Sequence, residues 1–456
     1  MSFGYPPRSF ASAVTRQSWA GSPLATVFFA GASILNDSYL ARAVVSAVLL
    51  SSVAALQAQP LPLGNAAQAG FSAEGLGNID AFFEREVQAS RVPGAVIAIA
   101  RDGKLIYQKA YGYLDNAQGT PMPLDAIFAL ASMTKIMTSV AALTLNQEGK
   151  LPLRSPVSQY YPGFAQMQVG VPQADGSLRL VPQNRPMFVH DLMRHTSGLT
   201  YGGRGDHPIA KLYPGGTTPA LEGSTQAFID RITKLPLAHQ PGVQFEYSFS
   251  TDVLGAVVEK VTGQRLGAYL QDKVWKPLGM IDATFEVPPQ KRARIAKAFA
   301  NNPLDGKSQS IPVVDQQTKS DCGGACAFST VADYLRFGQM LMNGGVLDGQ
   351  RILSPQMVAL MTSNHLGPEI RNLVGTIEGH REGYGFGLGV AVRMQPGLAA
   401  VPGSVGEYSW NGAYGTVFFA DPREKLVVVV GTAAPGELRK YYREQVQALV
   451  YGAMTR

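Results

Sequence analysis

Histidine, cysteine and tryptophan are scarce in this sequence. Its 456 residues include six histidines, two cysteines and three tryptophans. The histidines never recur at the spacing that puts two zinc ligands on one helix, and no cysteine neighbour completes a ligand set, so a metal site is disfavoured. The sequence Gly-x-Ser-x-Gly is also missing from the chain. Its absence argues against the nucleophile elbow of an α/β-hydrolase.

Long runs of charge are missing as well. The formal net charge is +6, yet no run of four or more lysines or arginines occurs. Nucleic-acid binding is therefore not expected. With 46% hydrophobic and 16% charged residues, the chain can bury a large core as one large domain or two closely joined ones.

The N-terminal 58 residues differ from the rest. Residues 41–58, ARAVVSAVLLSSVAALQA, join Arg42 to an apolar stretch that ends in small residues. This pattern predicts a secretory signal peptide cleaved after Ala58, and hence a protein exported to the periplasm or secreted. Residues 1–40 are explained if the start codon is assigned too far upstream and the true start is near Leu40. A buried helix or a membrane anchor stays open, but no stable membrane span is expected after cleavage.

Export gives the two cysteines a chemical context. Cys322 and Cys326 lie four positions apart in DCGGACAF. In an oxidising compartment they could close a small disulfide loop. Two free or buried thiols are an equally acceptable interpretation.

Hydrophobic periodicity organises the rest of the chain. After a Gly- and Ala-rich linker at 59–70, one domain is expected over 71–456. It begins with an amphipathic helix near 76–89. A hairpin follows, in which GAVIAIA and KLIYQKAYGYL flank a turn at Asp102 and Gly103.

The C-terminal end mirrors this arrangement. Strands are predicted in YGFGLGVAVRM and GTVFFADPREKLVVVVGTA, and a closing helix near 438–454. Helix patterns fill the middle, about 136–335, between Pro- and Gly-rich loops. Strands at both ends with helices between them predict an α+β fold, with an antiparallel sheet formed from both chain ends and a mostly helical subdomain.

Ser132 and Lys135 are the first candidate catalytic residues. Lys135 is the one lysine of the chain with a serine three positions earlier. On a helix these positions are neighbours, and a serine in the first turn lies where backbone N–H groups favour a developing oxyanion. A lysine among apolar residues can activate that serine. The pattern is short enough to arise by chance, and serine is also a common helix cap.

Two further segments add chemistry. Tyr247, in PGVQFEYSFSTDVLGAVVEKVTG, stands just before an apolar helix, where its phenol could act as a general base if a cation such as Lys135 lowered its pKa. A buried structural tyrosine is the alternative. Residues 406–422, GEYSWNGAYGTVFFADP, place a glycine-flanked segment at the start of a strand, where a backbone N–H can approach a ligand.

Together these segments resemble the serine β-lactamase and penicillin-binding-protein superfamily. Within it, the chain is most similar to the family VIII carboxylesterases, which look like class C β-lactamases. The resemblance covers about 70–454. It also includes the segments DLMRHTSGL, KPLGM, GGACAFSTVADYLRFGQMLMNGGVLDGQRILSP and YGFGLGV.

The resemblance assigns roles to the first candidates. Ser132 matches the acylated nucleophile, Lys135 its partner lysine and Tyr247 the tyrosine of the second motif. Tyr247, as phenolate beside Lys135, would take the proton of Ser132. His195 is expected to brace a loop. The reaction would need neither a metal nor an organic cofactor.

The third motif departs from the β-lactamase pattern. Its usual Lys-Thr-Gly falls on Trp410, Asn411 and Gly412, and the next residue, Ala413, would share the oxyanion with the N–H of Ser132. Phe249 occupies the position of the second-motif asparagine. Because Trp410 and Phe249 carry no charge, these substrate-binding positions are expected to favour neutral esters over anionic β-lactams.

The sequence therefore predicts a serine carboxylesterase that hydrolyses short-chain esters, with possible weak β-lactamase activity. A class C-like β-lactamase and a D-Ala-D-Ala carboxypeptidase share the expected fold and nucleophile. A non-catalytic, penicillin-recognising binding protein is the rival outside enzymes. A small-molecule ester is the expected partner, and the oligomeric state is left open.

Overall fold

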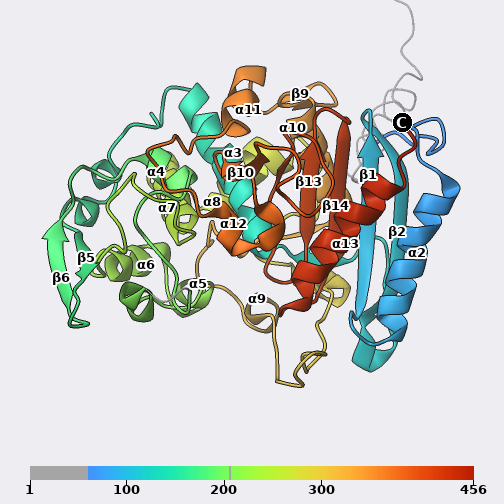
Figure 1. Ribbon diagram of the computed structural model, residues 1–456, viewed down its shortest axis with the longest axis horizontal. Helices are drawn as coiled ribbons and strands as arrows, with labels where there is room; N and C mark the ends of the chain where they lie inside the picture. Colours follow the sequence, from blue (N-terminus) through green and yellow to red (C-terminus); the bar gives the residue numbers. More distant parts are fainter. Residues whose placement is uncertain (1–59, 205–206) are drawn as a thin grey trace, which may run out of the picture. The chain divides into compact units, whose positions relative to one another are not determined.

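The computed structural model describes residues 60–204 and 207–456 (Figure 1). The predicted signal peptide, with its cleavage site after Ala58, lies outside these residues. Within the described ranges, no helix is long and apolar enough to cross a membrane. The described part of the predicted linker runs along the sheet, because the N–H of Gly64 donates to the carbonyl of Leu105 (2.8 Å).

An eight-stranded antiparallel sheet joins the two ends of the chain, as the sequence predicted. Its strand order is β10-β11-β12-β13-β14-β1-β2-β3. The central pair comes from opposite ends of the domain, with β1 (Gly94–Arg101) antiparallel to β14 (Leu426–Thr432). The other strands are β2 (Lys104–Asp115), β3 (Thr120–Pro121), β10 (Tyr384–Phe386), β11 (Ala391–Arg393), β12 (Tyr408–Ser409) and β13 (Val417–Asp421).

Helices cover both faces of this sheet. The N-terminal helix α2 (Ala73–Gln88) and the C-terminal helix α13 (Leu438–Gly452) pack against each other beside the first two strands (Figure 1). Helix α10 (Val331–Met342) packs on β1 and β14. Successive residues of β1 point to opposite faces, so its side chains enter two separate hydrophobic clusters. This is why β1 reads as a continuous apolar run.

The middle of the chain builds a second layer around α3 (Thr134–Gln147) and α7 (Ser250–Thr262), which contact each other. The predicted helical character is present, but a hairpin that the sequence pattern did not indicate also lies here.

The further helices are α4 (Val189–Met193), α5 (Thr218–Glu222), α6 (Thr225–Ile232), α8 (Leu266–Leu270), α9 (Pro312–Asp315), α11 (Pro355–Met361) and α12 (Val374–Ile377). The paired short strands are β4 (Ile127–Ala129) with β7 (Phe328–Thr330), β5 (Gln168–Pro172) with β6 (Leu178–Pro182), and β8 (Val346–Leu347) with β9 (Gln350–Arg351).

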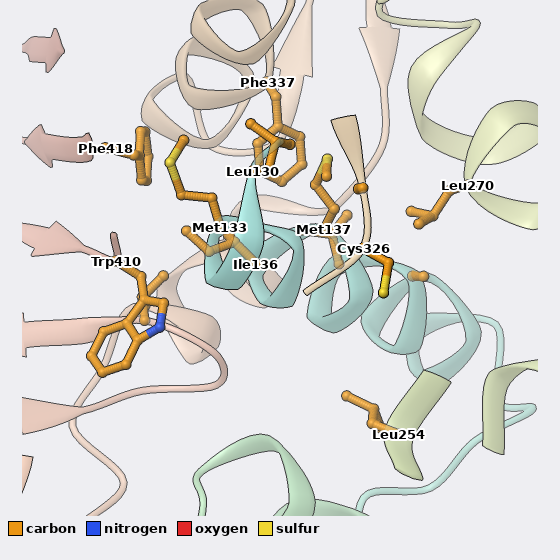
Figure 2. Packing of buried hydrophobic residues seen from close by; sticks show 14 of the residues in the cluster. Leu130, Met133, Ile136, Met137, Leu254, Leu270, Cys326, Phe337, Trp410 and Phe418 are labelled. Carbon is orange, nitrogen blue, oxygen red and sulfur yellow. The ribbon is translucent and has the colours of Figure 1, made fainter. Parts of the chain in front are cut away.

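Helix α3 lies in the core between the sheet side and the helical layer. Met133, Ile136 and Met137 are fully buried. Figure 2 shows side chains from both layers gathered around the start of α3, with Phe418 on the sheet side and Leu254 from α7. Packing on all sides fixes the helix, and so fixes the residues at its N-terminal end.

Candidate active site

Ser132 stands in a short 3₁₀ turn, Ala131–Met133, directly before α3. The sequence predicted the first turn of the helix, so the structure places the serine slightly earlier. Its neighbours Ala131 and Met133 are buried, whereas Ser132 itself is partly exposed. Ala131 has a φ of +45°, which is unusual for a residue with a side chain and marks a constrained backbone next to the candidate nucleophile.

Lys135 is buried on the same face, one turn further along. Only 1% of its surface is exposed. Its Nζ donates to the carbonyl of Gly324 (2.7 Å) and to the hydroxyl of Tyr201 (3.2 Å). The same Nζ lies 4.6 Å from the centre of the Tyr247 ring. The structure thus brings the first two sequence motifs together.

Tyr247 lies in the loop that leads into α7, as predicted, and is buried. Its hydroxyl accepts a hydrogen bond from Nε1 of Trp410 (3.1 Å). Burial by itself raises the pKa of Tyr247. The positive charge of Lys135 and hydrogen bonds with Lys135, Ser132 and Trp410 outweigh burial, so this pKa lies below its ordinary value. A tyrosine in this environment is suited to act as a base.

Trp410 sits at the end of β12, in the turn toward β13, rather than at the start of a strand. Its N–H pairs with the carbonyl of Phe418 (3.2 Å). The indole is only 3% exposed, and the guanidinium of Arg381 lies 4.7 Å from its ring centre. Trp410 therefore acts on Tyr247 as a hydrogen-bond donor and presents little apolar surface to a ligand.

Gly412 and Ala413 bring the turn close to the serine. A Cβ at Gly412 would lie 2.4 Å from the carbonyl oxygen of Leu130, in the segment just before Ser132. Only glycine allows this approach. Ala413, the next residue, is exposed, and its N–H has no hydrogen-bond partner among the described residues. That N–H is available to an oxyanion.

A cavity of about 210 Å³ is lined by residues from all three motifs. The predicted residues that line it are Ser132, Tyr247, Trp410, Asn411 and Ala413. A larger cavity of about 740 Å³, lined by residues such as 115–118 and 297–303, contains none of the predicted catalytic residues.

Phe249 does not line the cavity that holds Ser132. Its side chain is 1% exposed and packs against the rings of Tyr201 (4.4 Å between centres) and Phe228 (5.6 Å). The substrate-binding role predicted for it has no contact to support it. The position resembled a motif, but the ring turns into the core of the helical layer.

Sequence reasoning missed the charged residues of the same cavity. They are Arg204, Glu378, Arg381, Arg439, Lys440 and Arg443. Three of these residues lie close together near the start of the closing helix. The sequence contains this basic cluster, but an analysis of helix periodicity does not identify it. Arg204 lies over the Tyr247 ring, 4.8 Å from its centre.

A buried hydrogen-bond network surrounds the side chain of Lys135. Asp252, in the first turn of α7, accepts from the N–H of Gly324 (3.0 Å) and from the hydroxyl of Tyr201 (3.4 Å). Burial raises the pKa of Asp252 to about 6, although the charge of Lys135 opposes this shift. The network places a carboxyl group and a carbonyl near the lysine.

A disulfide closes the loop that carries Gly324. Cys322 and Cys326 are bonded, with their Cα atoms 5.3 Å apart. The carbonyl of Gly323, inside this loop, accepts from the hydroxyl of Thr138 on α3 (2.7 Å). The question left open by the cysteine spacing is therefore answered by a bonded pair next to the site.

His195 supports the loop before the site. It is fully buried, its backbone φ is +55°, and its ring centre lies 4.8 Å from that of Tyr247. Burial, followed by the charges of Lys135 and Arg204, lowers the pKa of His195 well below its ordinary value. These contacts fit a residue that braces Tyr247.

The large antiparallel sheet with its flanking helices places the protein among those with the β-lactamase/transpeptidase fold. The chain belongs to the β-lactamase family, whose model, described as Beta-lactamase, matches residues 79–451. The superfamily predicted from the motifs is thereby confirmed.

Three comparisons illustrate the relationship. Protein Rv1367c of Mycobacterium tuberculosis is 36% identical over 76% of this chain and 87% of its own length. Esterase EstB of Burkholderia gladioli is 30% identical over 78% of this chain and 89% of its own. The solved structure of EstCE1, described as a hydrolase with promiscuous acyltransferase activity, has a TM-score of 0.69 at 27% identity and covers 83% of this chain and 99% of that one.

Proposed function

We propose that this protein is a serine carboxylesterase that hydrolyses short-chain esters through an acyl-enzyme on Ser132. One observation carries the proposal: a partly exposed serine shares a cavity with a tyrosine whose pKa is lowered beside a buried lysine. Esterase EstB and EstCE1 support the ester as the reacting group.

Acylation starts with the proton of Ser132. Tyr247, as phenolate, accepts this proton while Oγ attacks the ester carbonyl carbon. The carbonyl oxygen becomes negative and is stabilised by the N–H groups of Ser132 and Ala413. When the tetrahedral intermediate collapses, the bond to the alcohol oxygen breaks and Tyr247 returns the proton to the departing alcohol.

Deacylation repeats these steps with water. Tyr247 takes a proton from the water as its oxygen attacks the acyl carbon, and then returns the proton to Oγ of Ser132 as the acid leaves. Lys135 stabilises the phenolate of Tyr247. The chain's own residues account for every proton in the cycle.

Replacing the nucleophile tests this proposal. We expect Ser132→Ala to lower kcat/KM for p-nitrophenyl butyrate by at least about a thousandfold, because the covalent route is lost. Ser139→Ala is a matched control: Ser139 lies on α3, the helix that follows Ser132, is buried, and its hydroxyl has no hydrogen-bond partner among the described residues. The control should keep its activity. Retention of more than about a hundredth of the activity by folded Ser132→Ala would contradict the assignment.

A β-lactamase is the second candidate, because basic side chains line the cavity and could receive the carboxylate of a β-lactam. Nitrocefin distinguishes the two. Turnover of nitrocefin that depends on Ser132 and exceeds ester turnover would favour the β-lactamase.

A further inference from the structure

The peptide group that joins Gly412 to Ala413 has different partners on its two sides. Its N–H belongs to Ala413, which lines the cavity that holds Ser132, and has no hydrogen-bond partner among the described residues. Its carbonyl oxygen belongs to Gly412 and accepts two hydrogen bonds, from the N–H of Gly415 (3.0 Å) and from the guanidinium of Arg443 on α13. Carbonyl and N–H point in opposite directions in a trans peptide. A cation therefore holds one side of this peptide, while the other side is free to bind an oxyanion.

Arg443 is buried, and a carboxylate holds its guanidinium in place. Only 3% of its side chain is exposed, and it forms an ion pair with Glu378, the residue after α12. Burial lowers the pKa of Arg443 to about 9, so the guanidinium keeps its charge at neutral pH. Glu378 also pairs with Arg381 (3.2 Å). One carboxylate thus balances two guanidinium groups, and the cluster keeps a net positive charge beside the peptide.

A cation on a carbonyl oxygen changes the N–H of the same peptide. The C–N bond has partial double-bond character, so the group is planar and its oxygen and nitrogen share electron density. A charged donor at the oxygen draws density away from the nitrogen, and hydrogen bonds in a chain polarise one another. The N–H of Ala413 becomes a stronger donor, and the two bonds to the Gly412 oxygen fix its direction.

We infer that Arg443 is a positioning residue of the oxyanion site, which orients and polarises the peptide between Gly412 and Ala413. The inference rests on the proposed ester hydrolysis and deepens it. In this role the guanidinium acts through the backbone and does not touch the substrate. Its effect is largest when the reacting carbonyl oxygen carries negative charge, so it favours the transition state over the bound ester.

Removing the charge of Arg443 tests the inference. We expect Arg443→Gln to lower kcat for p-nitrophenyl butyrate by about tenfold with little change in KM, because an oxyanion donor is weakened and not lost. The inhibition constant of n-butylboronic acid should rise by about the same factor, since its adduct with Oγ of Ser132 is an anionic tetrahedral mimic of the intermediate. Circular dichroism checks that this variant and those below are folded.

Glu378→Gln separates polarisation from simple support of the turn, and it leaves Arg443 in place. The substitution removes the ion pair of Arg443 but keeps its guanidinium and the donation to Gly412. If the ion pair only braces the turn, Glu378→Gln should lose boronate affinity as Arg443→Gln does. We expect affinity at least equal to that of the wild type, because loss of a buried negative charge increases the positive charge beside the peptide.

Arg393→Gln is the matched control. Arg393, on β11, is 2% exposed, donates to the hydroxyl of Tyr384 (3.0 Å) and does not line the cavity. The control removes a buried guanidinium that has no hydrogen bond to the turn at Gly412. It should keep the kcat and the boronate affinity of the wild type.

Four results would overturn the inference while leaving ester hydrolysis intact. They are unchanged kcat in Arg443→Gln, a loss of kcat without a matching loss of boronate affinity, equal losses in Arg393→Gln, and a loss of boronate affinity in Glu378→Gln. If the wild type does not hydrolyse p-nitrophenyl butyrate, the proposed function itself fails and this inference fails with it.

Discussion

Tyr247 is the residue whose proton affinity the site controls most directly. Its ring lies under the charge of Lys135, and its hydroxyl receives the indole N–H of Trp410. Both contacts favour the phenolate over the phenol. In this chain the tryptophan of the third motif therefore helps to lower the pKa of Tyr247, in addition to filling space.

Trp410→Phe should shift the pH dependence of the reaction. The active form of Tyr247 is deprotonated, so kcat/KM rises with pH through the pKa of Tyr247 and then levels off. Loss of the indole donor removes one of the causes that lower this pKa, so the rising limb should move to higher pH. The measurement is the pH profile of kcat/KM for p-nitrophenyl butyrate.

Trp275→Phe is the control for that profile. Trp275 is also buried, but its indole donates to the sulfur of Met137 (3.3 Å). Its profile should coincide with that of the wild type. An unchanged rising limb in Trp410→Phe would show that the indole does not tune Tyr247.

Single residues of the site could be predicted where a motif is local. Ser132 and Lys135 share a helix face by their spacing, and Tyr247 is marked by the helix that follows it. Phe249 has the same local signal, yet its side-chain direction depends on packing with Tyr201 and Phe228. That packing involves segments distant in sequence, so the pattern alone could not supply it.

At the scale of elements, the disulfide loop 322–326 connects two helices of the site. Through backbone groups of Gly323 and Gly324 it contacts Thr138 and Lys135 on α3 and Asp252 on α7. Backbone atoms cannot be replaced individually, so their position depends on how the loop is closed. The bonded cysteines supply that closure.

Opening the loop should weaken catalysis. We expect Cys322→Ser/Cys326→Ser to lower kcat by about tenfold, because the carbonyl that holds Lys135 becomes less well fixed. Steady-state kinetics with p-nitrophenyl butyrate measures this effect. Dithiothreitol should reduce the activity of the wild type and leave the double variant unchanged. Full activity of the folded variant would show that the loop needs no covalent closure.

Elements with a local pattern matched the sequence closely. The helix predicted at 76–89 is α2, Ala73–Gln88, which starts early because the Ser72 side chain accepts from the N–H of Gly75. The hairpin turn at Asp102 and Gly103 is also present, between β1 and β2. The hairpin β5–β6 was not predicted, because its strands are short and β6 is largely exposed.

At the scale of the whole molecule, the site depends on both ends of the chain. The nucleophile comes from the 3₁₀ turn that leads into α3, the base from the loop before α7, and three of the basic residues from α13 near the C-terminus. Because β14 pairs with β1, the C-terminal segment is held against the N-terminal one. The charge of the cavity could not be predicted from sequence, since it arises only when these distant segments meet.

The central claim is that Ser132 becomes covalently acylated during turnover. Mixing the enzyme with p-nitrophenyl butyrate, quenching rapidly with acid and mapping peptides by mass spectrometry tests it directly. We predict one butyryl group on the peptide that contains Ser132, formed at least as fast as steady-state turnover. Product formation with no acylated peptide, or with the acyl group on another residue, would contradict the account.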